Sequence, residues 1–311
     1  MDCTIVVVNY ANEDVLPDCL QSIRTTCDPA SVETVVVDNS GGLARAGFPQ
    51  RFPWARFLAS PGNVGFARAS NLGLQSGRGR HVLLLNPDAV LHPRAVESMV
   101  AHLDASPGTA IVGPRLLNPD GSLQFSCRRF PGWLTIFFGR YALLSRCFPG
   151  NRATRSYLYQ DLGHAHLRSV DWVSGACLMA RRAAIDRVGP LDEGYFLFVE
   201  DMDWCRRMRD AGLEVAYLPD AQVTHRIGVS RGSVAAYVVL ARHRAMLRYV
   251  RKHFRPSWPL QALVAAGLAL RASAQVALGF FAPAPAKRPV AETEPAVAEI
   301  CAAWTETGKA G

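Results

Sequence analysis

The segment Arg80-His-Val-Leu-Leu-Leu-Asn86-Pro-Asp88-Ala-Val-Leu91 decides the fold prediction. Its valine and three leucines form an apolar run that is typical of a buried strand, and the run ends abruptly at Asn86 and Pro87. Ligand sites in open α/β sheets lie beyond the carboxyl ends of strands, so we expect Asp88 to point its carboxylate into a site. A lone carboxylate there suits Mg²⁺ or Mn²⁺ shared with substrate phosphates, whereas the alternative is a helix cap.

Apolar runs alternate with helical patterns on both sides of this segment. Such alternation predicts an α/β protein with a parallel sheet and helices on both faces. A looser stretch from about 116 to 169 indicates a long inserted connection, and regular structure returns at Val170–Ala180. The expected strands are Thr4–Val8, Thr34–Asp38, Arg56–Ala59, Val82–Asn86, Ala110–Gly113 and Val215–Leu218, and the expected helices are Glu13–Thr26, Val64–Ser76, Pro93–Ala105 and Met202–Ala211.

Composition narrows the class of protein. The chain has 311 residues, 49% of them hydrophobic, enough for one large core or for one core with a small subdomain. Its net charge of +8 indicates an anionic partner. The eight cysteines show neither a CxxC pair nor zinc-ligand spacing, which favours reduced thiols in the cytosol. The strand-like run Cys3–Val8 lacks the features of a signal peptide, so we expect a cytoplasmic catalytic part.

The C-terminal region differs from the rest. Residues 233–254 read as a basic helix, and the apolar stretch from Trp258 to Phe281 has the length of a membrane span but holds Gln261, Arg271 and Gln275. A basic cluster beside an apolar helix favours attachment at a membrane surface; the alternative is packing on the domain or on a second subunit. Residues 283–311 are rich in Ala, Pro and Glu and are expected to be disordered. The expected organisation is a catalytic domain at 1–232, helices at 233–282 and a tail at 283–311.

Polar side chains follow the first two strands. Asn9 and Tyr10 end the first, and Asp38 ends the second. We expect Asp38 to accept the imide N–H of a pyrimidine and Tyr10 to flank the base, the alternative being an Asx-turn at each strand end. The motif Gly62-Asn-Val-Gly-Phe-Ala67 opens a helix with small residues, a place that attracts phosphate, although it is not GxGxxG.

An acidic cluster lies near the expected helix Met202–Ala211. Glu200, Asp201 and Asp203 follow an aromatic-rich run, and clustered acids in a cleft shift each other's pKa in a way that suits a general base. The alternative, acid enrichment of a first helical turn, is our interpretation of Asp203. His225 follows the late strand and is a candidate partner of Asp88 at a metal, the alternative being a packed histidine.

These motifs occur in an order that resembles one known family. The sequences VVNY, VDNS, GNVGFA, LLNPD, WVSGACLM, FVEDMD and VTH, spread over residues 3 to 255, resemble family 2 glycosyltransferases, and in particular bacterial dTDP-rhamnosyltransferases. The resemblance implies a GT-A fold, a Rossmann-like nucleotide-binding sheet with an acceptor-side region, and inverting sugar transfer. It implies Asp201 as catalytic base; Asn9, Tyr10, Asp38, Asn63, Gly65, Phe66, Asn71 and Asn86 at the donor nucleotide; Trp172, Gly175 and Glu200 at the acceptor; and Asp88 and His225 at a Mg²⁺ or Mn²⁺ ion.

The resemblance also implies substrates and a location. We expect transfer of L-rhamnose from dTDP-rhamnose to a hydroxyl of a glycan or a polyprenyl-diphosphate-linked glycan, at the inner face of the bacterial plasma membrane, in cell-surface polysaccharide synthesis. Alternatives are a transferase using a UDP-hexose or UDP-N-acetylhexosamine, and a non-catalytic scaffold of a polysaccharide assembly complex. A homodimer is kept open. Nucleic-acid binding rests on net charge alone, with no matching motif.

Overall fold

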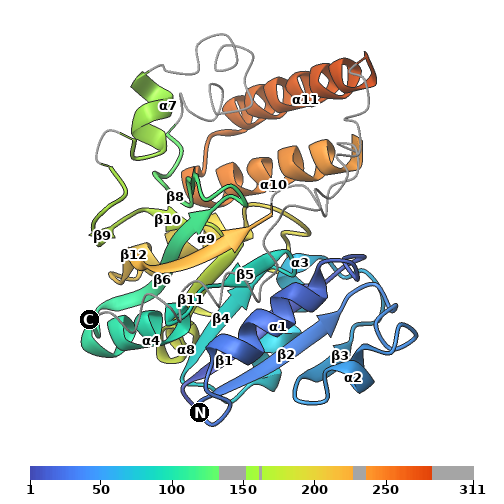
Figure 1. The fold of residues 1–311 in the computed structure, drawn as a ribbon. Helices are drawn as coiled ribbons and strands as arrows, with labels where there is room; N and C mark the ends of the chain where they lie inside the picture. The colour runs from blue at the N-terminus through green and yellow to red at the C-terminus, as the bar shows by residue number, and fades with distance from the viewer. Residues whose placement is uncertain (133–151, 161–162, 227–235, 282–311) are drawn as a thin grey trace.

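A computed structural model describes residues 1–132, 152–160, 163–226 and 236–281 (Figure 1). A ten-stranded mixed sheet carries the order β3-β2-β1-β4-β11-β6-β12-β5, with β7 beside β6 and β9 beside β12. The expected α/β class is confirmed. The strands are β1 (Cys3–Asn9), β2 (Val32–Asp38), β3 (Arg56–Ala59), β4 (His81–Leu85), β5 (Ala89–Leu91), β6 (Thr109–Leu117), β7 (Leu123–Gln124), β8 (Cys127–Arg128), β9 (Arg168–Ser169), β10 (Trp172–Val173), β11 (Cys177–Arg181) and β12 (Glu214–His225).

The first half of the sheet is parallel, as expected. β1 lies between β2 and β4, with Asn9 opposite Asp38 and Val7 opposite Leu85. All residues of β1 and β4 are buried, which explains their near-continuous apolar sequences. The register brings the carboxyl ends of these strands level, so the polar residues that follow them share one edge of the sheet.

The second half departs from the parallel expectation. β11 lies between β4 and β6 and is antiparallel to both, and β12 is parallel to β6 but antiparallel to β5. Cys177 pairs with Leu85, and the Asn86 N–H donates to the Ala176 carbonyl at 2.9 Å. The turn before β11 therefore meets the end of β4, which places Gly175 at the same edge as the first-half residues.

Helices cover both faces, as expected. Val6 and Val37 face one core with α3 and α9, whereas Ile5 and Val36 face the other core with α1 and α4. This alternation follows from the two-residue period of a strand. The helices are α1 (Leu16–Thr26), α2 (Phe48–Arg51), α3 (Phe66–Ser76), α4 (Ala95–Ala105), α7 (Arg152–Tyr157), α8 (Arg182–Val188), α9 (Glu200–Asp210), α10 (Ala236–Phe254) and α11 (Trp258–Phe281).

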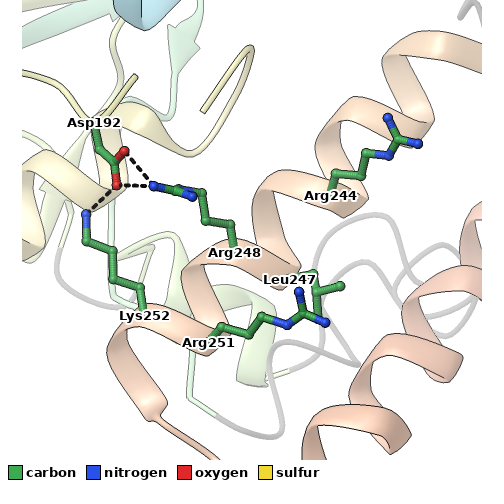
Figure 2. A pocket seen from close by; sticks show the side chains of 6 residues that line it. All are labelled: Asp192, Arg244, Leu247, Arg248, Arg251 and Lys252. Carbon is green, nitrogen blue, oxygen red and sulfur yellow. Dashed lines mark hydrogen bonds and ion pairs between the residues drawn. The ribbon is translucent and has the colours of Figure 1, made fainter. Parts of the chain in front are cut away.

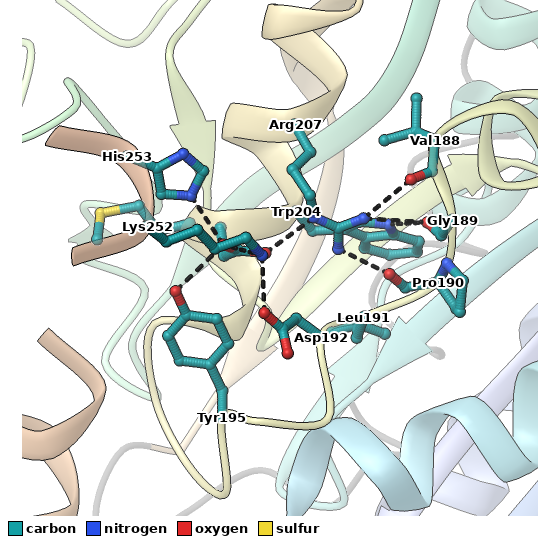
Figure 3. Close-up of polar contacts among 12 residues, drawn as sticks. Val188, Gly189, Pro190, Leu191, Asp192, Tyr195, Trp204, Arg207, Lys252 and His253 are labelled. Carbon is teal, nitrogen blue, oxygen red and sulfur yellow. Dashed lines mark hydrogen bonds and ion pairs between the residues drawn. The ribbon is translucent and has the colours of Figure 1, made fainter. Parts of the chain in front are cut away.

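A buried carboxylate joins α10 to the rest of the molecule. Asp203 of α9 is fully buried, and its oxygens lie 2.8 Å from His253 Nε2, 2.8 Å from Lys252 Nζ and 2.9 Å from Arg207 Nε. Figure 3 shows these partners, together with Tyr195, gathered around one point. Asp203 lies in the acidic first turn of α9, as expected, and it is also the centre of an ion-pair network that the sequence did not indicate.

The two C-terminal helices lie side by side (Figure 1). α11 buries Val264 and Leu268 against Val250 of α10, and it leaves Leu263 65% and Leu270 74% exposed. By length and composition, the stretch Trp258–Ala277 could cross a membrane. The division at residue 232 stays a prediction, and residues 133–151, 233–235 and the expected tail lie outside the described residues.

Candidate active site

One cavity of about 400 Å³ opens where the strands of the sheet end. It gathers ten of the fourteen residues that the sequence nominates, from both halves of the chain. The four others, described below, lie close by without lining it. The ten are Tyr10, Asn63, Gly65, Phe66, Asn86, Asp88, Gly175, Glu200, Asp201 and His225.

Asp88 and His225 form a pair in this cavity. β12 and β5 are antiparallel with His225 opposite Ala89, so the histidine ends beside the residue that follows Pro87. His225 Nε2 lies 3.3 Å from Asp88 Oδ1, and both side chains are buried. His225 Nδ1 lies 2.7 Å from Gln124 Oε1, which only accepts hydrogen bonds, so Nδ1 carries the proton. In the neutral imidazole Nε2 is then the acceptor nitrogen, and it faces the carboxylate.

This pair fits a divalent cation. Two ligands that bind one ion at about 2.1–2.2 Å, roughly at right angles, lie about 3 Å apart, close to the separation of Asp88 Oδ1 and His225 Nε2. The carboxylate suits Mg²⁺ or Mn²⁺, and the imidazole is a common ligand of transition metals, with a partner on its other ring nitrogen as is usual for a metal-binding histidine. Within the described residues no group of three or more His, Cys, Asp and Glu side chains is placed to hold a metal, so substrate oxygens would complete the coordination.

Asp201 begins α9 after a strained turn. Phe198 and Val199 both have positive φ, +70° and +73°, a conformation that is rare for β-branched and bulky residues. The turn directs the next two side chains, Glu200 and Asp201, into the cavity. Asp201 Oδ2 accepts the Gly175 N–H at 2.8 Å, so the turn before β11 fixes the carboxylate.

Burial makes both carboxyl groups hold their protons more strongly than usual. Burial raises the pKa of Asp201, although the N–H groups of Gly175 and Met202 oppose the rise. Burial also raises the pKa of Glu200 well above its usual value, and the negative charge of Asp201 raises it further. Glu200 Oε2 is buried without a hydrogen-bond partner among the described residues. The pair can thus offer one charged base beside one protonated carboxyl group.

Asp38 and Asn9 lie just outside the cavity. Asp38 accepts hydrogen bonds from the N–H groups of Ser40, Gly41 and Leu43 at 2.8–3.1 Å, so its carboxylate holds the loop that follows β2. This is the Asx-type arrangement that the sequence left open. Asn9 is fully buried, and its Oδ1 has no hydrogen-bond partner among the described residues. Direct contact of these two side chains with a base stays a prediction.

Asn71 and Trp172 do not line the cavity but hold segments that lie next to it. The Asn71 amide donates to the Leu191 carbonyl at 2.9 Å and accepts the Leu191 N–H at 3.1 Å, which ties α3 to the segment that leads to α9. Trp172 is 7% exposed and donates its indole N–H to the Arg129 carbonyl. The Arg128 guanidinium lies over the indole ring, 4.7 Å from its centroid. Contacts of Asn71 with a donor and of Trp172 with an acceptor stay predictions.

Comparison with known proteins identifies the family. A family model described as "Glycosyltransferase like family 2" matches residues 2–255, more than three quarters of the chain. The chain belongs to this glycosyltransferase family. It is 30% identical to the N-acetylglucosaminyl-diphospho-decaprenol L-rhamnosyltransferase of Mycobacterium tuberculosis, over 88% of this chain and 92% of that protein. It is 23% identical to the rhamnosyltransferase WbbL of Escherichia coli, over 71% and 82% of the two chains. The expected resemblance to rhamnosyltransferases is therefore confirmed.

Solved structures confirm the GT-A fold of this glycosyltransferase. The mannosyltransferase PcManGT from Pyrobaculum calidifontis, solved with GDP-Man and Mn²⁺, aligns with a TM-score of 0.55 over 99% of this chain and 79% of that one, at 17% identity. GalNAc-T7, solved with UDP, GalNAc and Mn²⁺, aligns with a TM-score of 0.58 over 80% and 48% of the two chains, at 13% identity. At these identities the likeness shows the fold alone.

The glycosyltransferase cavity also has walls that sequence reasoning missed. Asn39 Oδ1 accepts the Val64 N–H at 3.0 Å, and its amide donates to Asn63, which joins the loops after β2 and β3. The aromatic residues at 196 and 198 and Tyr237 of α10 form another wall. Asn39 lies in the VDNS motif and could have been found there. Tyr237 carries no sequence signal, because α10 reaches the cavity only through the folded chain.

Proposed function

We propose that this glycosyltransferase transfers L-rhamnose from dTDP-rhamnose, with inversion, to a hydroxyl of a lipid-linked glycan in cell-surface polysaccharide synthesis. The observation that carries this proposal is that one cavity is lined by the buried carboxyl group of Asp201, the candidate base, and by the candidate metal pair Asp88 and His225. The names of the relatives support rhamnose as the sugar and a diphospho-polyprenol glycan as the acceptor.

In the proposed reaction, Asp201 removes the proton of the acceptor hydroxyl as its oxygen attacks C1 of the donor sugar from the face opposite the leaving group. The Gly175 N–H holds the carboxylate in position. Glu200 keeps its proton beside it and is placed to donate a hydrogen bond to the acceptor. Tyr10, Asn63, Gly65, Phe66 and Asn86 would line the donor side.

Asp88 and His225 are the residues that would hold Mg²⁺ or Mn²⁺ in this proposal. The bound ion would neutralise negative charge on the departing nucleoside diphosphate. The bond from Nδ1 to Gln124 would orient the imidazole so that Nε2 of its neutral form faces the ion.

We further propose that the enzyme works at the cytoplasmic face of the plasma membrane. α10 presents exposed arginines, and the neighbouring helix α11 presents exposed leucines. Basic and apolar side chains on one surface bind anionic membranes through charge attraction and partial insertion. Such attachment would bring the cavity to an acceptor whose lipid lies in the bilayer.

The first test is nucleoside diphosphate release from a panel of donors. The purified protein is supplied with dTDP-rhamnose, UDP-glucose, UDP-galactose or UDP-N-acetylglucosamine, and with N-acetylglucosaminyl-diphospho-polyprenol as acceptor. We expect turnover of dTDP-rhamnose with Mn²⁺ or Mg²⁺ and none with chelator. Turnover of a UDP-sugar alone would replace rhamnose by that sugar, and no turnover of any donor would favour the non-catalytic scaffold.

A further inference from the structure

A second pocket, of about 630 Å³, lies against the outer side of α10. Figure 2 shows Arg248 and Lys252 of α10 reaching toward Asp192, whereas Arg244 and Arg251 extend away from it. Asp192 comes from the segment that leads to α9, so the pocket has walls from two parts of the chain. Its lining is Asp192, Arg244, Leu247, Arg248, Arg251 and Lys252.

The pocket holds more positive charge than its one carboxylate balances. Arg248 Nη2 and Lys252 Nζ bind Asp192 at 2.8 and 2.7 Å, so the carboxylate orients these two cations. Arg244 and Arg251 are exposed, and neither has an ion-pair partner among the described residues. Gly194 has no side chain, which lets the Arg248 guanidinium lie directly over this segment. An anion entering the pocket would meet two oriented and two unpaired cations.

The pocket and the catalytic cavity are lined by the same two elements, α10 and the segment that leads to α9. Tyr237 lines the cavity, and Arg244, Arg248 and Arg251 follow it at intervals of seven, four and three residues, which places all four on one face of α10. Seven residues of helix span about 10 Å. The segment that begins at Asp192 in the pocket likewise reaches the cavity at residue 196. A ligand could occupy both spaces at once.

We propose that this pocket binds the diphosphate group of the lipid-linked acceptor while the acceptor sugar lies in the catalytic cavity. The inference rests on the proposed function and adds a site to it. Guanidinium groups bind phosphate oxygens through paired hydrogen bonds, and several of them suit a group with two phosphates. Leu247 lines the pocket and packs against the cluster of Val264 and Leu268 of α11, so an apolar element that suits a polyprenyl chain borders the pocket. A concave pocket about 10 Å along α10 from the cavity favours one bound acceptor over general attraction to anionic lipids.

The test compares two pairs of arginine variants that lose the same charge. Arg244→Ala/Arg251→Ala removes the unpaired cations, and Arg78→Ala/Arg94→Ala removes two exposed arginines away from the pocket. Transfer is measured in neutral detergent with N-acetylglucosaminyl-diphospho-farnesol and with a neutral alkyl N-acetylglucosaminide. We expect the first pair to raise KM at least tenfold for the diphosphate acceptor and to leave kcat and the KM of the neutral acceptor unchanged. Equal effects on both acceptors, or none, would overturn the proposal.

Direct binding separates this proposal from the catalytic one. Farnesyl diphosphate is titrated into each protein with chelator present, so that no metal holds it in the catalytic cavity. We expect a dissociation constant at least tenfold higher for Arg244→Ala/Arg251→Ala than for the wild type and the control pair. Equal binding by all three would overturn the site even if sugar transfer is observed. Loss of anionic-vesicle binding with unchanged farnesyl diphosphate binding would assign the arginines to the membrane surface instead.

Discussion

The neighbouring carboxyl groups of Asp201 and Glu200 should differ in how much their substitution lowers kcat. We expect Asp201→Asn to lower kcat by about 10²- to 10⁴-fold, the usual contribution of a general base, with donor binding retained. Glu200→Gln should stay within about tenfold of the wild type, because burial keeps Glu200 protonated and glutamine imitates the neutral form. Steady-state kinetics and calorimetric donor binding measure both. A larger loss for Glu200→Gln than for Asp201→Asn would exchange the two roles.

The pH dependence of kcat follows from the same burial. Asp201 acts in its charged form, and burial raises its pKa above the 3.8 of an ordinary aspartate. Activity should therefore be full above this raised pKa and fall as the pH drops through it. A pH profile of kcat for the wild type checks this. Glu200→Gln should keep this acidic limb, because Glu200 is already neutral where Asp201 titrates.

If Asp88 and His225 bind the metal ion, substitutions at His225 should change the Mn²⁺ concentration that the enzyme needs. His225→Ala and Gln124→Ala should each raise the Mn²⁺ concentration for half-maximal activity, by about 10- to 100-fold for Gln124, which only orients the imidazole. His92 is the control: it lies on the same pair of strands, bonds to Thr224 Oγ1 at 2.8 Å and does not line the cavity. A shift for His92→Ala equal to that for His225→Ala would contradict the assignment.

Individual residues also show how far sequence reasoning reaches. The apolar runs locate the strand ends, and the strand ends locate the cavity, so the sequence alone indicates that Asp88 lines it. Asp201 lines it too, but it was nominated from its acidic cluster and the family resemblance. The sequence also assigns Asp38 and Asn71 to the right loop and helix, yet backbone groups engage both side chains. A sequence pattern fixes where a side chain starts, but the competition for its hydrogen bonds is decided in the folded chain.

Among the elements, we expect the largest loss of stability from a substitution at the contact between α9 and α10. Burial alone would raise the pKa of Asp203, but hydrogen bonds from His253, Lys252 and Arg207 outweigh it and lower the pKa far below the usual range. The charged form therefore stabilises the fold above the ordinary pKa of an aspartate, and this contribution is lost as the pH falls below it. Asp203→Asn should cost about 3 kcal/mol at neutral pH, since it leaves buried cations unpaired.

Urea unfolding measures this cost, with Asp210→Asn as the control on the same helix. Asp210 forms an exposed ion pair with Arg206, so its loss should cost less than about 1 kcal/mol. Equal costs for the two variants would mean that the network around Asp203 contributes no more than a surface pair.

The elements predicted best are those that carry their own pattern. β1, β2 and β4 are largely buried apolar runs with polar ends, β3 is a partly exposed edge strand, and the predicted bounds of all four lie within two residues of the observed ones. β12 was expected to end at Leu218, but it continues through Pro219 and Asp220 to His225 across a register shift. The antiparallel insertion of β11 was missed, because partner choice in a sheet depends on the distant strands β4 and β6 rather than on local sequence.

At the scale of the whole molecule, the exposed side of α11 predicts membrane binding. Leu263→Ser/Leu270→Ser should weaken binding to vesicles of anionic phospholipid by about tenfold per residue, because burying a leucine contributes about 1.5–3 kcal/mol. Leu167→Ser is the control, since Leu167 is 52% exposed but lies outside the C-terminal helices. Cosedimentation at low and high salt measures both terms, because the contribution of the α10 arginines is screened by salt and that of the leucines is not. If the double variant binds vesicles as the wild type does, the apolar side of α11 faces a protein partner, and the acceptor would have to reach the cavity without help from the bilayer surface.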